Sequence, residues 1–200
     1  MLYTAYEATH AAIGPMRMAA DAARRFYRSP INPMAYMPHS KAVAAACDVF
    51  ERVTRRYGKP EWGIDDTQID GRSVPITIES AKKLPFCDLL HFRRDPKRLP
   101  RTRRNDPKIL IVAPLSGHYA TLLRGTVQAM LPEHDVYITD WADARTVPVS
   151  QGRFDLEEYT DYIIKFLRFL GPDTHVMAVC QPGPAVLAAT SVLAAHDDPC

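Results

Sequence analysis

Three short runs of consecutive apolar residues, separated by stretches with helical spacing, constrain the fold of this chain most strongly. An uninterrupted apolar run of about four to eight residues is typical of a strand that is buried on both faces of a sheet. Such strands alternate with helices when βαβ units build a parallel sheet. We therefore predict an α/β fold with a mostly parallel sheet and flanking helices. The predicted strands are residues 108–115, 135–141 and 175–179, and the predicted helices are residues 119–131, 155–170 and 183–195.

The N-terminal part of the chain has a different pattern, which is typical of helices. Residues 16–27 are rich in alanine and arginine, and a second helix is expected to begin at Ser40, which can cap it. Gly58 supplies a stop signal for this second helix. We expect a helical N-terminal segment over residues 1–70.

A strand pattern follows this segment. Apolar residues alternate with polar ones in residues 74–78, which is the period of a half-buried strand, and a second strand-like run covers residues 86–92. Together they predict an antiparallel pair. We expect these strands and the alternating region behind them to form a core over residues 71–200.

The balance of charge and the spacing of the cysteines exclude several classes of function. The chain has 25 Lys and Arg residues and 23 Asp and Glu residues, and its net charge of +2 is too small to indicate a nucleic-acid or membrane-surface partner. No apolar run approaches the ~20 residues of a membrane-spanning helix. Four widely spaced cysteines without a CxxC pair indicate neither a zinc site nor a disulfide framework. We expect a cytoplasmic protein without a metal or a cofactor.

Cys180 lies where a predicted buried strand gives way to a predicted helix. This order is that of a nucleophile elbow, in which a tight turn exposes a nucleophile at the edge of a sheet. The N-terminus of a helix also favours the thiolate form of a cysteine. Ala178 and Pro182 occupy the positions at which the elbow pattern usually has glycine. The alternative is a buried free cysteine, because cysteine often packs as a small apolar residue.

The loop after the first predicted parallel strand is small and polar, as an oxyanion-hole loop would be. In α/β-hydrolases this loop donates one N–H group and the residue after the nucleophile donates another. The candidate donors are the backbone N–H groups of Leu115 or Ser116 and of Gln181. An ordinary loop between a strand and a helix is the alternative. His118 is expected to line a pocket, and its use as a base for Cys180 or its being a plain loop residue stays open.

The chain resembles the intracellular poly(3-hydroxybutyrate) depolymerases in four segments: MLYTAYEATHAA, APLSGHYATLLRG, DVYITDWADAR and VCQPGPAVLAA. The resemblance covers residues 1–200. It implies the N-terminal part of an α/β-hydrolase fold, in which Cys180 matches the nucleophile of a Cys-Asp-His triad. It also implies short-chain polyhydroxyalkanoate, stored in cytoplasmic granules, as the substrate, and the polymer or granule surface as the partner.

The other two members of such a triad are not recognisable in the sequence. They follow the nucleophile in chain order, the acid first and then the histidine. His196, Asp197 and Asp198 come at the end of a single helix, too near Cys180 in the sequence to fold back over it. We therefore expect the acid and the histidine to lie beyond Cys200, or the protein to be catalytically incomplete. In either case we expect residues 1–200 alone to be inactive on amorphous poly(3-hydroxybutyrate), the polymer that the resemblance implies as substrate.

Two alternatives to a depolymerase stay open. Polyhydroxyalkanoate synthases resemble the same fold with an elbow cysteine, but they carry glycine on both sides of it, where this chain has Ala178 and Pro182. The second alternative is a granule-binding module without catalysis. A homo-oligomer is possible under each hypothesis.

Overall fold

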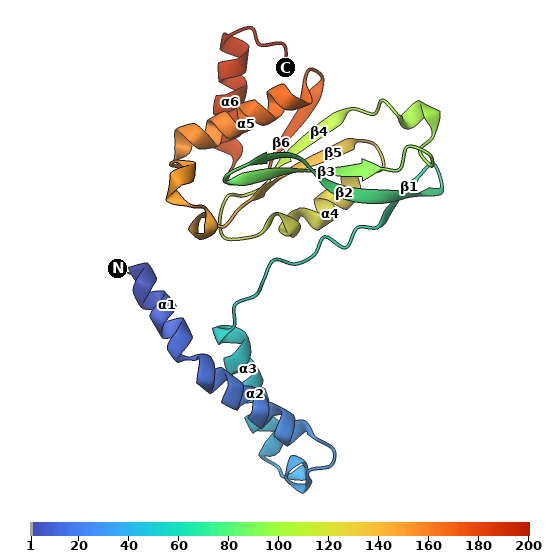
Figure 1. Ribbon diagram of the computed structural model, residues 1–200. Helices are drawn as coiled ribbons and strands as arrows, with labels where there is room; N and C mark the ends of the chain where they lie inside the picture. The colour runs from blue at the N-terminus through green and yellow to red at the C-terminus, as the bar shows by residue number, and fades with distance from the viewer. Residues whose placement is uncertain (1) are drawn as a thin grey trace. The chain divides into compact units, whose positions relative to one another are not determined.

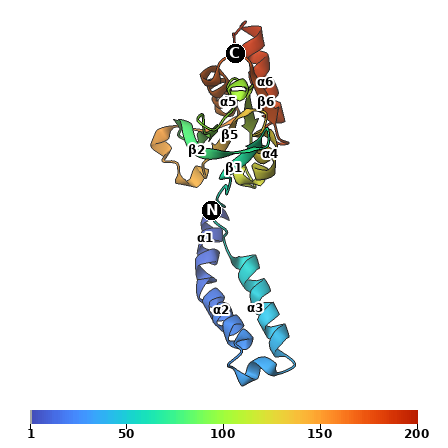
Figure 2. The same ribbon diagram turned by 90° about the vertical axis from the view of Figure 1, so that its right-hand side faces the viewer.

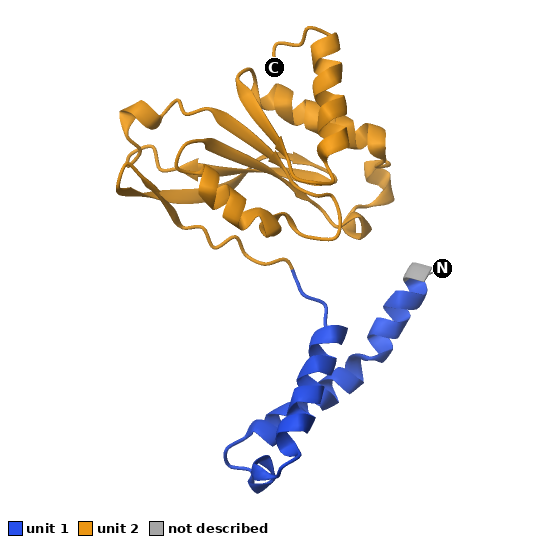
Figure 3. Ribbon diagram, turned by 180° about the vertical axis from the view of Figure 1, so that it is seen from behind, with its two compact units in different colours: residues 1–58 blue, residues 59–200 orange. Residues whose placement is uncertain are grey.

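The computed structural model describes residues 2–200, which divide into two compact units, Met1–Gly58 and Lys59–Cys200 (Figure 3). The division therefore lies at Gly58 and not at residue 70 as expected. Trp62 and Ile64 are the reason, because both side chains are buried in the core of the second unit. The indole of Trp62 meets the ring of Phe92 edge-on at a centroid distance of 4.9 Å.

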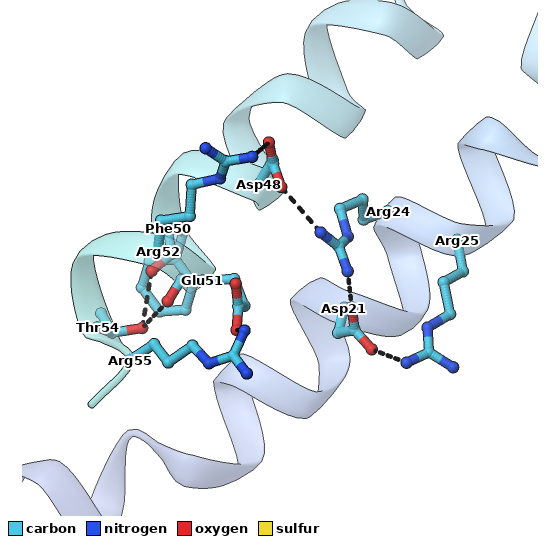
Figure 4. Close-up of polar contacts among 9 residues, drawn as sticks. All are labelled: Asp21, Arg24, Arg25, Asp48, Phe50, Glu51, Arg52, Thr54 and Arg55. Atoms are coloured by element: carbon cyan, nitrogen blue, oxygen red, sulfur yellow. Dashed lines mark hydrogen bonds and ion pairs between the residues drawn. The ribbon is translucent and has the colours of Figure 1, made fainter. Parts of the chain in front are cut away.

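The first unit is helical, as predicted. It contains α1 (Leu2–Ala12), α2 (Gly14–Arg28), the short 3-10 helix η1 (Pro33–Tyr36) and α3 (Ser40–Thr54). Helices α2 and α3 lie side by side (Figure 2), and Arg24 on α2 pairs with both Asp21 and Asp48 (Figure 4). Ser40 does not cap α3. It is the first residue of that helix, and its hydroxyl donates to the carbonyl of Met34.

The second unit is built on one sheet of six strands in the order β1-β2-β3-β5-β4-β6 (Figure 1). Three neighbouring pairs are antiparallel and two are parallel, so the expectation of a mostly parallel sheet is wrong, whereas the mixed α/β class is confirmed. The strands are β1 (Asp66–Ile69), β2 (Arg72–Leu84), β3 (Cys87–Arg94), β4 (Lys108–Val112), β5 (Asp135–Trp141) and β6 (Thr174–Ala178).

The connections explain the mixed pairing. Short turns join β1 to β2 and β2 to β3, and a short turn can only return the chain antiparallel to itself. Strand β3 then joins the predicted strands by pairing antiparallel with β5. Parallel pairing is confined to β4 with β5 and to β4 with β6, whose connections contain helices.

Helices cover both faces of this sheet. One face packs against α5 (Leu156–Leu170) and α6 (Gly183–Ala195), and the other packs against η3 (Ala120–Leu123) and α4 (Arg124–Met130). Strand β4 lies between them: Leu110 contributes to the first core and Ile111 to the second. This placement accounts for the uninterrupted apolar run of β4. Further 3-10 turns are η2 (Arg101–Arg103), η4 (Ala144–Thr146) and η5 (Val149–Gln151).

The helix predictions for this unit are confirmed with one change. Asp155 caps α5 and forms a capping box with Glu158, as the sequence indicates, and Gly171 ends the helix with a positive φ of 83°. The helix expected over residues 119–131 is instead a 3-10 turn followed by α4. Strand β6 is only half-buried, because β4 is its single neighbour within residues 2–200.

Candidate nucleophile site at the end of β6

The candidate site lies where the order of strands reverses. From β4 the chain first adds β5 on one side and then crosses to add β6 on the other. Strands β4 and β6 run parallel, with Val112 opposite Ala178, so the loops that follow them leave the same edge of the sheet. In open α/β sheets, ligands bind in the crevice at such a reversal, outside the carboxyl ends of the strands.

Cys180 lies in the tight turn between β6 and α6. Its φ of 65° is in the left-handed region, which is unfavourable for a residue with a Cβ atom. The N–H of Gly183 donates to the carbonyl of Cys180 at 3.1 Å, and this bond closes the turn. Strained non-glycine residues of this kind are concentrated at functional sites.

The thiol of Cys180 is exposed, which removes the alternative of a buried packing cysteine. Cys87 on β3 is such a packing cysteine instead: it is fully buried, and burial raises the pKa of its thiol well above the usual value. Cys47 on α3 is half-buried. Cys180 therefore differs from both in access to solvent.

The predicted oxyanion-hole residues meet in space through the side chain of Gln181. The backbone N–H of Leu115 donates to Oε1 of Gln181 at 2.7 Å, and the N–H of Ser116 donates to the same oxygen at 3.2 Å. Nε2 of Gln181 in turn donates to Oγ of Ser116 at 3.2 Å. The structure thus brings together Leu115, Ser116 and the residue that follows Cys180. The acceptor role of the Gln181 side chain has no signal in the sequence.

His118 lies in the same loop and lines a cavity of about 530 Å³ beside Leu115. Within residues 2–200, no hydrogen bond joins His118 to Cys180. The cavity is lined by apolar, aromatic and charged residues: Pro60, Leu115, Gly117, His118, Tyr119, Thr121, Leu122, Arg124, Trp141, Ala142 and Asp143. It is large enough for a small acyl group, and Leu115 is the N–H donor that lines it, whereas Ser116, Cys180 and Gln181 are not among its lining residues.

A histidine–carboxylate pair that the sequence did not reveal lies at the other end of the parallel strands. Nε2 of His91 on β3 is 2.8 Å from Oδ1 of Asp135, the first residue of β5. Burial acts to raise the pKa of the Asp135 carboxyl, but the hydrogen bond and charge of His91 outweigh it and hold this pKa below the ordinary value. Cys180 follows the carboxyl end of β6, whereas Asp135 is at the start of β5, so this pair cannot serve as its base.

The described residues hold no cluster of three or more His, Cys, Asp or Glu side chains that could ligate a metal ion. Within residues 2–200, no helix is both long and apolar enough to cross a membrane.

Fold and site together define a mixed α/β protein with an exposed cysteine at a positive φ, in which the side chain of the next residue accepts hydrogen bonds from two converging backbone N–H groups. Comparison of the chain with protein-family models, with curated proteins and with solved structures found no match.

Proposed function

We propose that the second unit carries the nucleophile of a cysteine-dependent α/β-hydrolase, and that the reaction is hydrolysis of short-chain poly(3-hydroxybutyrate) esters. The observation that carries the proposal is the exposed Cys180 at φ 65° in a strand–turn–helix connection. In an α/β-hydrolase the nucleophile occupies such a turn at the top of the sheet. The resemblance to the intracellular depolymerases in four segments supplies the substrate class.

The arrangement of β4 and β6 supports the α/β-hydrolase part of the proposal. The oxyanion-hole loop of that fold follows the strand next to the nucleophile strand. Here the loop of Leu115 and Ser116 follows β4, the neighbour of β6. The antiparallel strands β1, β2 and β3 extend the sheet on the far side of β5 and leave this corner unchanged.

The proposed chemistry proceeds in two steps. The sulfur of Cys180 forms a bond to the ester carbonyl carbon, the bond to the leaving alcohol oxygen breaks, and that oxygen takes up a proton. Negative charge on the carbonyl oxygen is stabilised by the N–H groups of Leu115 and Ser116, which converge on one oxygen, and not by one of them together with the backbone N–H of Gln181 as the sequence indicates. Water then adds to the thioester, the carbon–sulfur bond breaks, and a 3-hydroxy acid and the thiol are released. The second step needs a base to activate the water, whereas the first needs the thiolate, the N–H donors and a proton that water supplies to the leaving oxygen.

A burst assay tests this division. With p-nitrophenyl butyrate, residues 1–200 are expected to release about one nitrophenolate per chain and then to turn over slowly. Peptide mass spectrometry should place the butyryl group on Cys180. The variant Cys180→Ala should lose the burst, and Cys47→Ala should keep it. A burst that survives in Cys180→Ala, or a butyryl group found on Cys47, would contradict the proposal.

Polymer and thioester substrates separate the depolymerase from its alternatives. The expected result is release of 3-hydroxybutyrate from amorphous granules that depends on Cys180. This release needs the chain together with the acid and the histidine of the implied triad. Polymer formation from 3-hydroxybutyryl-CoA would instead favour a synthase. Binding to granules that is unchanged in Cys180→Ala, with no release from either substrate, would favour a non-catalytic granule-binding protein. The proposed location is the surface of cytoplasmic storage granules.

A further inference from the structure

The side-chain oxygen of Gln181 occupies the position to which two backbone N–H groups of another loop point. Leu115 and Ser116 donate to this oxygen at 2.7 Å and 3.2 Å, although they lie more than 60 residues before it in the chain. A third hydrogen bond, from Nε2 of Gln181 to Oγ of Ser116, fixes the orientation of the amide. The side chain of Gln181 therefore links the loop of Leu115 and Ser116 to the turn of Cys180 through three hydrogen bonds.

An amide carbonyl oxygen accepts hydrogen bonds from N–H groups, as the oxygens of esters and carboxylates do. Two N–H groups that converge on one oxygen beside a nucleophile form the geometry of an oxyanion hole. The oxygen of Gln181 and the oxygen of a bound acyl group cannot occupy this position together. Binding of an acyl ligand at these N–H groups thus requires the Gln181 side chain to leave.

We propose that Gln181 is a displaceable plug, whose side-chain oxygen holds the N–H groups of Leu115 and Ser116 until an acyl or carboxylate oxygen replaces it. The catalytic meaning of this exchange rests on the proposed function, but the exchange itself is a binding equilibrium that does not need the chemistry of Cys180. The remainder of such a ligand has room in the 530 Å³ cavity, which Leu115 also lines.

The strength of these contacts suits an exchange. Gln181 is exposed, and its bonds join neutral groups, so they hold the side chain only weakly against water. A carboxylate carries charge, and its hydrogen bonds to N–H groups are roughly twice as strong. The apparent affinity for a ligand falls by the fraction of molecules in which the site is closed. Gln181 therefore lowers the affinity for acyl ligands in general, and a ligand that makes further contacts in the cavity offsets this loss.

The test uses the intact chain and the probe 3-hydroxybutyrate. The variant Gln181→Met keeps the length of the side chain and removes both the acceptor and the donor. The matched control is Gln128→Met, at an exposed position on α4. Backbone amide signals of Leu115 and Ser116, observed by nuclear magnetic resonance during titration, report the occupation of the N–H pair.

In the ligand-free Gln181→Met protein, the amide signals of Leu115 and Ser116 are expected to shift from their wild-type positions. The variant should bind 3-hydroxybutyrate about tenfold more tightly than the wild type, while Gln128→Met should bind as the wild type does. Gln181→Asn, whose shorter side chain cannot span the same distance, should behave like Gln181→Met. Gln181→Asn keeps the test valid if the side chain introduced by Gln181→Met itself fills the cavity.

Unchanged ligand-free amide signals, or equal affinities in the wild type and both variants, would overturn the proposal. So would an absence of any effect of 3-hydroxybutyrate on Leu115 and Ser116. The burst assay separates the two proposals, because the titration measures the plug and the burst measures acylation of Cys180. An intact plug with no Cys180-dependent burst would refute the proposed function alone, and a burst without the tenfold effect would refute the plug alone.

Discussion

Cys180 combines a positive φ with a side chain, and this combination makes a specific prediction about stability. A left-handed conformation costs a residue with a Cβ atom about 1–2 kcal/mol, and glycine adopts it freely. Cys180→Gly should therefore be more stable than Cys180→Ala by about 1 kcal/mol, as measured by urea denaturation.

The expected order is the reverse of that at an ordinary helical position. Ala188→Gly, at an exposed position within α6, is the control and should lower the stability by about 0.5–1 kcal/mol. If Cys180→Gly is the less stable of the two Cys180 variants, the turn does not hold the strained conformation.

Exposure of the thiols predicts the order in which they are alkylated. At neutral pH, iodoacetamide should label Cys180 first and the half-buried Cys47 later. Cys87 should stay unlabelled in the native protein, since burial both excludes the reagent and raises the pKa of its thiol. Peptide mapping over time gives the three rates. Labelling of Cys47 ahead of Cys180 would contradict the assignment of the elbow.

At the scale of single elements, two residues of β3, Arg94 and His91, pair with carboxylates that lie far away in the sequence. Local sequence patterns do not reveal either pair. Residues 93–108 contain eight basic side chains and read as a solvated loop. Arg94 at the end of β3 is nevertheless buried, and it pairs with Asp106 at 2.6 Å with side chains only 3% and 8% exposed. Register along a strand decides which arginine turns inward, and composition carries no such information.

Arg94 and its neighbour Arg93 form a matched pair for mutation. Arg94→Ala removes the nearer partner of the buried Asp106 carboxylate and leaves it only the longer contact with Arg103 at 3.4 Å, so it should lower the stability by about 3 kcal/mol. Arg93 is half exposed and pairs with Glu79 at 3.2 Å, so Arg93→Ala should change the stability by only about 0–1 kcal/mol. Urea midpoints of the two variants measure the difference. Equal effects would show that Arg94 is not buried as described.

The pair of His91 and Asp135 predicts a dependence of stability on pH. Because the folded-state pKa of Asp135 is below its unfolded value, its carboxylate stabilises the fold above about pH 4, and this contribution is lost as the pH falls through the folded pKa. Asp135→Asn should lower the stability by about 1 kcal/mol at pH 7. The difference from the wild type should shrink below about pH 4.

Denaturation curves at several pH values check this prediction. Asp161→Asn, at an exposed position on α5, serves as the control substitution. A difference between the wild type and Asp135→Asn that stays constant from pH 7 to about pH 3 would exclude the carboxylate as its source.

Elements with strong local signals could be predicted from the sequence, and those fixed by distant partners could not. The capping box of Asp155 and Glu158 and the apolar run of β4 each identify their element without further context. Strand β1 has only four residues, and its pairing with β2 decides its structure. For the same reason, the sequence indicated the turn of Cys180 but not the contacts of the Gln181 side chain.

At the scale of the whole molecule, the prediction of a parallel sheet failed because strand pairing is a property of connections. The three strands of the predicted parallel region have the expected pairing. The antiparallel pair was also predicted, and its pairing is confirmed, but nothing in the alternating pattern of residues 74–78 shows that β3 would extend the same sheet. The class of fold could therefore be predicted, whereas the structure was needed to show which strands the sheet contains and in which direction they pair.

The edge of the sheet at β6 predicts self-association. This strand has one neighbouring strand among the described residues, and Leu187 and Val192 on the adjacent α6 are 69% and 42% exposed. Unpaired strand edges and exposed apolar side chains promote association. Residues 1–200 should form oligomers as concentration rises, and Leu187→Lys should shift them toward monomers in sedimentation experiments. Gln128→Lys is the control for added charge, and a wild-type monomer at all concentrations would contradict the prediction.

The crossover between β4 and β6 also affects the order in which parts of the chain fold during synthesis. During synthesis, the loop of Leu115 and Ser116 leaves the ribosome more than 60 residues before Gln181, the residue that satisfies its N–H groups. Pairing over so long a separation forms late, because the chain must first order the intervening β5 and α5. In every shorter nascent chain the N–H groups of this loop are therefore without the Gln181 acceptor, which reaches them only when the turn after β6 has folded.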